Sequence, residues 1–398
     1  MSARRDIVMV GGAGRAGFPL GLMFANRPGL QVTLLDIDPE KVEKIQRGQA
    51  PFMEEHAESL LRQVIGKSLT ATTDDSCLEQ AAVVITLIGT PVDRHFNPTV
   101  HDFIRTTNRL LARMHDDSLL ILRSTVYPGV TQLVYERIKA LGQRILLGYC
   151  PERSAEGEAL AELPKFPQIV GAFEPEAGRR AAELFLTIAP SVVELAPLEA
   201  ELAKLFTNTW RYIHFAIANQ FYMLAQSHGV DFYRIHEAMT RDYPRLHDFP
   251  RAGFTAGPCL LKDAVQLSVF SGNTFQLGQA AMQVNEGLPN FVVEQLARQD
   301  LSTRRVAILG MAFKGDSDDN RQSLAYRLRK LLEVRAREVL CTDPYVADPS
   351  LVPLQKATGR ADIIILGVPH SVYRGLKFPP GKSVVDVWGF WPAQPEAG

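Results

Sequence analysis

Short apolar runs alternate with helical spacings through the first half of the chain. The runs that predict buried strands are Asp6–Val10, Val32–Asp36, Val83–Ile88, Leu119–Leu122, Ile145–Leu147 and Ile169–Val170. Helical patterns separate several of them, the first following Phe18. Strands that alternate with helices are typical of a parallel sheet covered by helices.

The pattern changes at Leu198. From there to about His228, apolar residues recur at helical spacing without an internal proline or glycine, which predicts one long helix. Further helical runs follow at Tyr233–Met239, Lys262–Val269 and Phe291–Ala297. The middle of the chain is therefore predicted to be all-helical.

Strand signals return after the polar stretch Gln299–Arg305, which we interpret as a linker. The predicted strands there are Val306–Gly310, Val339–Asp343, Ile363–Leu366 and Val384–Val387. At 398 residues the chain is too long for one hydrophobic core. We therefore predict an α/β fold with two Rossmann-like parallel-sheet domains, 1–197 and 300–398, joined by a central all-α domain, 198–299, built on the long helix.

Composition and charge narrow the functional classes. The 43 basic and 44 acidic side chains leave a net charge of −1, so no overall basic field favours nucleic acid or an anionic membrane. No apolar stretch reaches the roughly 18–20 residues of a membrane span. The four cysteines are far apart and form no CxxC pair. This spacing predicts neither a disulfide framework nor a metal site, and it favours a reducing cytoplasm.

A GxGxxG motif, formed by Gly12, Gly14 and Gly17, stands between the first strand and the first helix, and Asp36 ends the next strand. Such glycines let a helix N-terminus approach a pyrophosphate, while the acid binds a ribose and repels a 2′-phosphate. The pattern predicts NAD as cofactor. The predicted contacts are Gly12, Gly14, Arg15, Ala16, Gly17, Asp36, Gly89, Thr90, Pro91, Ser124, Thr125 and Lys262.

Polar residues follow three of the predicted strands. Thr90 and Thr125 each come directly after a strand, where ligands bind in parallel sheets. The segment 149–157 brings Glu152 and Glu156 to the same edge. Taken alone, these residues are equally compatible with ordinary turns and surface acids.

Cys259 stands in the segment AGPCLLKDA, where Pro258 and the apolar spacing after it predict the start of a helix. The positive end of a helix favours the thiolate. Asp263, four residues on, shares its face. A buried structural cysteine is the alternative.

Two further clusters carry charge. Lys204 and Asn208 lie four apart on the long helix, where a solvated lysine is the simpler interpretation. Lys314 and Arg321 flank the glycine turn that opens the last α/β segment. That turn suits a diphosphate, or it is a capped helix with a solvated charge cluster.

With these motifs in place, the chain resembles the UDP-glucose/GDP-mannose dehydrogenase family, the nucleotide-sugar 6-dehydrogenases, over nearly its whole length. The matching segments are GGAGRAGFPLG, EAELAKLFTNTWR, AGPCLLKD and GMAFKGDSDDNR. Two segments depart from the family pattern. AGPC replaces GGxC, and PERSAEG combines the arginine of N-acetylhexosamine-type members with the second glutamate of the glucose type.

The resemblance implies an NAD-binding first domain, a homodimer through the central helix and a UDP-sugar-binding last domain. It also implies four-electron oxidation of a sugar C6 alcohol to a carboxylate through a thiohemiacetal and a thioester on Cys259. We expect a UDP-glucose 6-dehydrogenase-like activity. A UDP-N-acetylhexosamine 6-dehydrogenase is the alternative.

The resemblance also assigns roles to residues. Lys204 and Asn208 would stabilise charge on the C6 oxygen, and Asp263 would orient water or assist proton transfer. Thr125 would position water, and Glu156 would be the general base of thioester hydrolysis. Either Arg245 or Arg251 would reach the partner subunit. The expected substrate contacts are Glu152, Arg153, Glu156, Lys204, Asn208, Arg245, Arg251, Phe254, Gly257, Lys314 and Arg321.

Two other functional classes remain. A two-electron hydroxyacid dehydrogenase also joins a nucleotide-binding domain to a helical one, but it needs neither Cys259 nor a second α/β segment. A non-catalytic nucleotide-sugar binding protein would bind without turnover. The number of NADH molecules released per product separates these classes from the thioester route.

Overall fold

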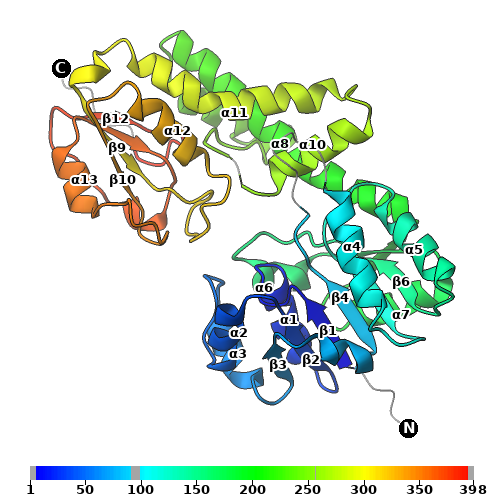
Figure 1. Cartoon of the computed structure of the whole chain (residues 1–398). Helices are drawn as coiled ribbons and strands as arrows, with labels where there is room; N and C mark the ends of the chain where they lie inside the picture. The colour runs from blue at the N-terminus through cyan, green and yellow to red at the C-terminus, as the bar shows by residue number, and fades with distance from the viewer. Residues whose placement is uncertain (1–5, 91–98, 256, 393–398) are drawn as a thin grey trace. The chain divides into compact units, whose positions relative to one another are not determined.

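The computed structural model describes residues 6–90, 99–255 and 257–392. The chain divides into two compact units, Met1–Thr207 and Asn208–Gly398 (Figure 1). The predicted central helices and the last α/β segment belong to one unit, because Phe232 and Leu288 share a hydrophobic core with Val306 and Ile308. The finer division into three domains stays a prediction.

The first unit is built on an eight-stranded sheet in the order β3-β2-β1-β4-β5-β6-β7-β8. The crossover between β1 and β4 is the topological switch point at which doubly wound sheets bind ligands. The strands are β1 Asp6–Val10, β2 Gln31–Leu35, β3 Leu69–Thr72, β4 Val83–Thr86, β5 Leu119–Leu122, β6 Leu146–Tyr149, β7 Gln168–Ala172 and β8 Val192–Leu195.

One strand pair departs from the predicted parallel sheet: β6 and β7 are antiparallel, with Tyr149 opposite Gly171. Arg123 donates both to the Cys150 carbonyl oxygen and to the Gln168 side chain. The connection between these strands therefore begins and ends at the same sheet edge, and β7 must run back. The expectation of a wholly parallel sheet is wrong at this pair.

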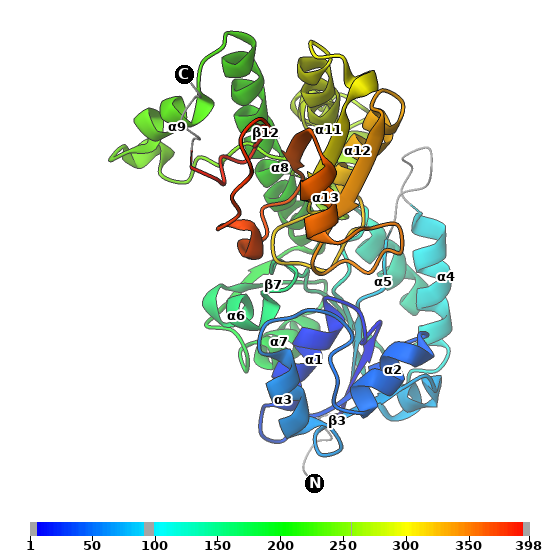
Figure 2. The same cartoon turned by 90° about the vertical axis from the view of Figure 1, so that its left-hand side faces the viewer.

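Helices cover both faces of this sheet (Figures 1 and 2). Alternate residues of β1 point to opposite faces. Met9 packs in the cluster that includes Phe18 of α1, and Val8 in the cluster that includes Phe103 of α4. The helices are α1 Gly17–Ala25, α2 Pro39–Gln46, α3 Ala57–Val64, α4 Val100–Leu111, α5 Val130–Ala140, α6 Ala159–Glu162 and α7 Pro175–Phe185.

The long helix α8, Pro197–Ser227, confirms the predicted helix and continues from the first unit into the second. It is followed by α9 Phe232–Thr240, α10 Leu260–Phe270 and α11 Gln276–Leu296. Helix α11 is longer than predicted and runs through Pro289. In the described residues no helix is long and apolar enough to cross a membrane.

The second unit also holds a parallel four-stranded sheet in the order β10-β9-β11-β12. Its strands are β9 Arg305–Leu309, β10 Glu338–Thr342, β11 Ile363–Leu366 and β12 Ser383–Val385, with helices α12 Leu324–Glu333 and α13 Leu354–Arg360. The two predicted α/β segments are confirmed. The predicted linker is partly ordered, because Leu301 is buried in a 3-10 turn.

Candidate active site

The first glycine turn is packed too closely for side chains. A Cβ on Gly12 would lie 2.7 Å from the Leu34 Cα, and one on Gly17 would lie 2.5 Å from the Gly11 carbonyl oxygen. Asp36, directly after β2, accepts a hydrogen bond of 3.0 Å from the Ala13 N–H. The turn, the start of α1 and the carboxylate are therefore arranged as the predicted NAD site requires.

The turns after β4 and β5 lie side by side. Thr90 Oγ1 donates to the Thr125 carbonyl oxygen, and Ser124 Oγ donates to the Thr86 carbonyl oxygen at 3.3 Å. These contacts bring the predicted strand-end residues to the carboxyl edge of the sheet. Pro91, predicted to contact the coenzyme, lies outside the described residues, while Gly89 is exposed.

Arg123 is a buried residue that the sequence analysis missed. Its side chain is fully buried and lies 4.8 Å from the centroid of the Phe185 ring. Its Nη2 donates to Glu152 Oε2 at 2.7 Å and to Gln168 Oε1 at 3.1 Å. The arginine directly after the apolar run 119–122 is the signal that could have identified it.

Both carboxylate oxygens of Glu152 accept hydrogen bonds. Its Oε1 accepts hydrogen bonds of 2.8 Å from the N–H groups of Arg153 and Ser154 and from the Ser154 hydroxyl. Burial alone would raise the pKa of Glu152, but Arg123 and Ser154 hold that pKa below its usual value. Its carboxylate therefore orders the 152–156 loop. The predicted contact of Glu152 with substrate stays a prediction.

Two further residues of this loop region have partners in the first unit. The Arg153 guanidinium lies 5.3 Å from the centroid of the Phe166 ring and donates to the Pro167 carbonyl oxygen. Glu156 forms an ion pair with Arg15 of the glycine turn.

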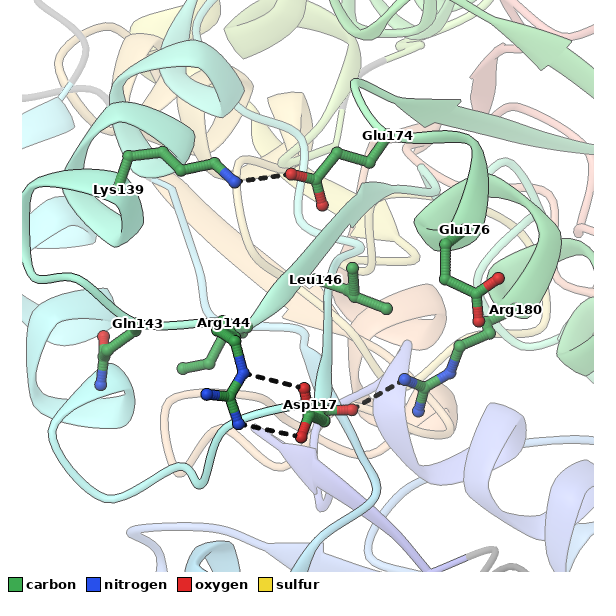
Figure 3. A pocket seen from close by; sticks show the side chains of 9 residues that line it. Asp117, Lys139, Gln143, Arg144, Leu146, Glu174, Glu176 and Arg180 are labelled. Carbon is green, nitrogen blue, oxygen red and sulfur yellow. Dashed lines mark hydrogen bonds and ion pairs between the residues drawn. The ribbon is translucent and has the colours of Figure 1, made fainter.

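A charged pocket of about 350 Å³ lies at the opposite edge of this sheet, near the amino ends of β5 and β6 (Figure 3). Most of its charged side chains bond to one another or to backbone, and Glu176 pairs with the neighbouring Arg179. Lys139 pairs with Glu174 at 2.6 Å, Arg144 with Asp117 at 3.3 Å, and Arg180 donates to the Asp117 carbonyl oxygen at 2.7 Å. The pocket has no part in the predicted site.

Cys259 occupies the N-cap position of α10, as the sequence pattern predicts. It is exposed, which argues against the alternative of a buried structural cysteine. Its carbonyl oxygen accepts the Asp263 N–H at 2.9 Å. Asp263 is fully buried, and its Oδ2 accepts the Asn208 side-chain amide at 2.6 Å. Lys262 Nζ lies 3.3 Å from the other carboxylate oxygen. The second unit thus brings Cys259, Asp263 and Asn208 together.

Lys204 lies on α8, one helical turn before Asn208. Only 7% of it is exposed, so the simpler interpretation as a solvated lysine is wrong. Residues four apart on a helix share a face, which agrees with the predicted pairing of Lys204 and Asn208.

The cysteine loop packs on the second glycine turn within the second unit. Gly257 has a φ of +106°, and a Cβ there would lie 2.6 Å from the Phe313 ring. Phe254 is buried and meets Trp388 edge-to-face at 6.5 Å between ring centroids. The main-chain N–H of Gly253 donates to Asn219 of α8 at 2.8 Å. The loop before Cys259 is therefore fixed by its own unit.

Asp343 organises the second glycine turn much as Asp36 does the first. Its Oδ2 accepts the N–H groups of Met311 and Ala312 at 2.6 and 3.1 Å, and His370 Nε2 lies 2.9 Å away. Burial would raise the pKa of Asp343, but His370 and the backbone donors lower it to about 2. The buried His370 is a second residue that the sequence analysis missed.

The predicted nucleotide contacts of this turn differ in their surroundings. Lys314 is half-buried. The Arg321 guanidinium binds the carboxylate of Asp319, with Nη2 and Oδ2 2.6 Å apart. Their contact with a nucleotide stays a prediction.

The two candidate partner-reaching arginines also differ. Arg251 donates to the Trp388 and Gly389 carbonyl oxygens at 3.3 and 2.5 Å, and lies 4.9 Å from the centroid of the Tyr233 ring. Arg245 is exposed and lies 5.9 Å from the ring of Tyr243, two residues earlier. Arg251 is therefore the more firmly held by its own subunit.

Three family models match almost the whole chain. They describe the NAD binding domain, the central domain and the UDP binding domain of the UDP-glucose/GDP-mannose dehydrogenase family, and they match residues 6–189, 198–287 and 307–392.

Individual relatives are similar over nearly their full length. A UDP-N-acetyl-D-mannosamine dehydrogenase of Pyrococcus horikoshii is 29% identical over 95% of this chain and 93% of the relative. The solved structure of a UDP-D-ManNAc dehydrogenase from that organism has a TM-score of 0.91 at 27% identity, covering 98% of this chain and 97% of the other. A UDP-glucose dehydrogenase structure from Pyrobaculum islandicum has a TM-score of 0.88 at 26% identity, with coverages of 97% and 95%.

Proposed function

Because the chain belongs to the UDP-glucose/GDP-mannose dehydrogenase family, we propose that it oxidises C6 of a UDP-N-acetylhexosamine to the carboxylate. It is an NAD-dependent oxidoreductase that acts on a nucleotide sugar. The observation that carries the proposed chemistry is the exposed Cys259 at the start of α10, next to the buried Asn208–Asp263 pair.

The sugar assignment revises the expectation of a UDP-glucose enzyme. The similar P. horikoshii proteins, by sequence and by structure, are named for N-acetylmannosamine, which favours the acetamido alternative. Arg153 supports the same choice, since the sequence resemblance links an arginine after Pro151-Glu152 to N-acetylhexosamine-type members. The similarity to a UDP-glucose dehydrogenase keeps glucose as the competing substrate.

The residues divide the oxidation into steps. NAD, when bound, supplies a hydride acceptor for each of the two oxidations. The Cys259 thiolate, at the N-terminus of α10, adds to the C6 aldehyde and later leaves as the thioester is hydrolysed. Asn208 has two amide hydrogens, and Asp263 accepts one of them. The other is left to stabilise a C6 oxyanion, together with the Lys204 ammonium.

The experiment that tests the sugar assignment is NAD reduction with UDP-GlcNAc, UDP-ManNAc, UDP-glucose and GDP-mannose. We expect kcat/KM to be at least about 10-fold higher for one N-acetylhexosamine than for UDP-glucose, because a site built to hydrogen-bond an acetamido group loses those bonds with a hydroxyl. A preference for UDP-glucose would contradict the assignment. Binding of all four without NAD reduction would instead favour a non-catalytic binding protein.

A homodimer through α8 is part of the proposal. Trp210, Ile217, Phe221 and Leu224 form one stripe on this helix at helical spacing, and they are 62, 39, 41 and 50% exposed. An exposed apolar stripe of this kind is typical of a protein–protein interface. Because Arg251 is held by its own subunit, we assign the arm that reaches the partner's site to Arg245.

Placing charges in this stripe should separate the subunits. The double variant Trp210→Glu, Phe221→Glu is expected to be monomeric in sedimentation velocity at micromolar concentration, because it buries charge at the interface. Val334→Glu is the matched control, since Val334 is 87% exposed and lies outside α8. A double variant that sediments like the wild type would contradict an α8 interface.

A further inference from the structure

The first glycine turn is joined to the predicted general base by an ion pair. Arg15 Nε, in the middle of GxGxxG, lies 2.9 Å from Glu156 Oε1. The two side chains are 21% and 17% exposed, so solvent screens the pair far less than an ordinary surface pair. Arg15, a predicted coenzyme contact, thus forms an ion pair with a carboxylate of the 152–156 loop.

The position of the Arg15 guanidinium is set by an aromatic ring. Its Cζ lies 4.9 Å from the centroid of the Phe52 ring, and Phe52 meets Phe18 of α1 edge-to-face at 5.7 Å. A guanidinium over an aromatic face is held in a defined plane. The guanidinium of Arg15 is therefore held at a defined position beside Glu156.

The segment that carries Phe52 also fixes the loop that carries Glu156. The Glu55 N–H donates to the Gly157 carbonyl oxygen at 3.4 Å, and Glu54 Oε1 accepts the Leu160 N–H at 3.2 Å. The contacts of the first unit therefore connect Arg15, Phe52 and Glu156 to one another, directly or through their loops.

We propose that Arg15 is a positioning residue for thioester hydrolysis: it holds the Glu156 carboxylate in place. This inference rests on the proposed function, because it needs Glu156 to act as the general base. In that step the water oxygen bonds to the thioester carbon and its proton passes to Glu156. The carbon–sulfur bond breaks, and the electron pair leaves on the Cys259 sulfur. Arg15 touches neither water nor thioester.

This role predicts a specific kinetic defect. Arg15→Met should slow turnover at least about 10-fold, since a general base is worth about 10²–10⁴-fold and the variant leaves it misplaced. The acyl adduct on Cys259 should accumulate during turnover, visible by intact-protein mass spectrometry. The KM for NAD should stay within about 3-fold of wild type, because in this role Arg15 acts through Glu156 and not through the coenzyme contact predicted from the sequence. Arg15→Lys should restore part of the rate.

Three comparisons decide the outcome. The double variant Arg15→Met, Glu156→Gln should be no slower than Glu156→Gln alone, because both changes act on one group. Arg62→Met, which removes an exposed ion pair with Glu58, is the matched control and should behave as wild type. A higher KM for NAD with no adduct would show that Arg15 serves the coenzyme and would overturn the inference. Unchanged turnover and no adduct in Glu156→Gln alone would overturn the proposed base, and the inference with it.

Discussion

Replacing Cys259 with alanine is expected to abolish uronate formation while NAD and UDP-sugar binding stay within about 3-fold of wild type. The variant lacks the sulfur on which the thioester forms. Its fold should be unaffected, because Cys259 is exposed and the substitution removes only one sulfur atom.

The other cysteines provide the control for this variant. Burial raises the pKa of Cys77 to about 11 and those of Cys150 and Cys341 to about 12, so these thiols stay protonated at neutral pH. Cys77→Ala should therefore keep full activity, and iodoacetamide should inactivate the wild type by labelling Cys259. Chromatographic detection of the uronate measures the outcome. Normal uronate formation by Cys259→Ala would contradict the covalent route.

The second large effect is expected on stability. Arg123→Met should lower the free energy of unfolding by about 3–5 kcal/mol at pH 7.5, because it leaves the buried Glu152 carboxylate without its cation. Urea unfolding of the full chain, followed by circular dichroism, measures the change. Arg105→Met, which removes the exposed pair with Asp102, is the matched control and should cost at most about 1 kcal/mol.

The stability lost in Arg123→Met should depend on pH. In the wild type the lowered pKa of Glu152 adds stability above its unfolded value of about 4.3, and that stability is lost as the pH falls. Without Arg123, burial should raise this pKa, so the variant should lose stability as the pH rises from 4.5 to 7.5. If Arg123→Met lowered the free energy of unfolding equally at pH 4.5 and 7.5, loss of the buried Arg123–Glu152 pair would not be the cause.

Local spacing was enough to predict the parts of the site that lie within one short segment. The glycines and Asp36 were identified from one strand, one turn and the next strand, and Asp36 accepts a hydrogen bond from that turn. The start of α10 at Cys259 followed from Pro258 and the apolar residues after it. Asp263 and Asn208 were each identified as site residues, but the hydrogen bond between them was not predicted, since no local pattern joins residues on two helices.

The sequence pattern could not predict contacts between distant segments of the chain. Arg123 and Glu152 lie in separate segments, and a buried arginine after an apolar strand gives no sign of its partner. The same holds for His370 and Asp343. The antiparallel direction of β7 depends on where its connection is held, which periodicity does not report. The edge strands β3 and β8 were missed because polar residues interrupt their apolar positions.

The most direct test of the acyl-carrier role of Cys259 is the number of NADH molecules formed per UDP-sugar consumed. A limiting amount of UDP-N-acetylhexosamine, excess NAD and complete conversion give this ratio from absorbance and chromatography together. The account predicts two NADH for each uronate formed. One NADH per product, with an aldehyde or ketone as that product, would contradict it.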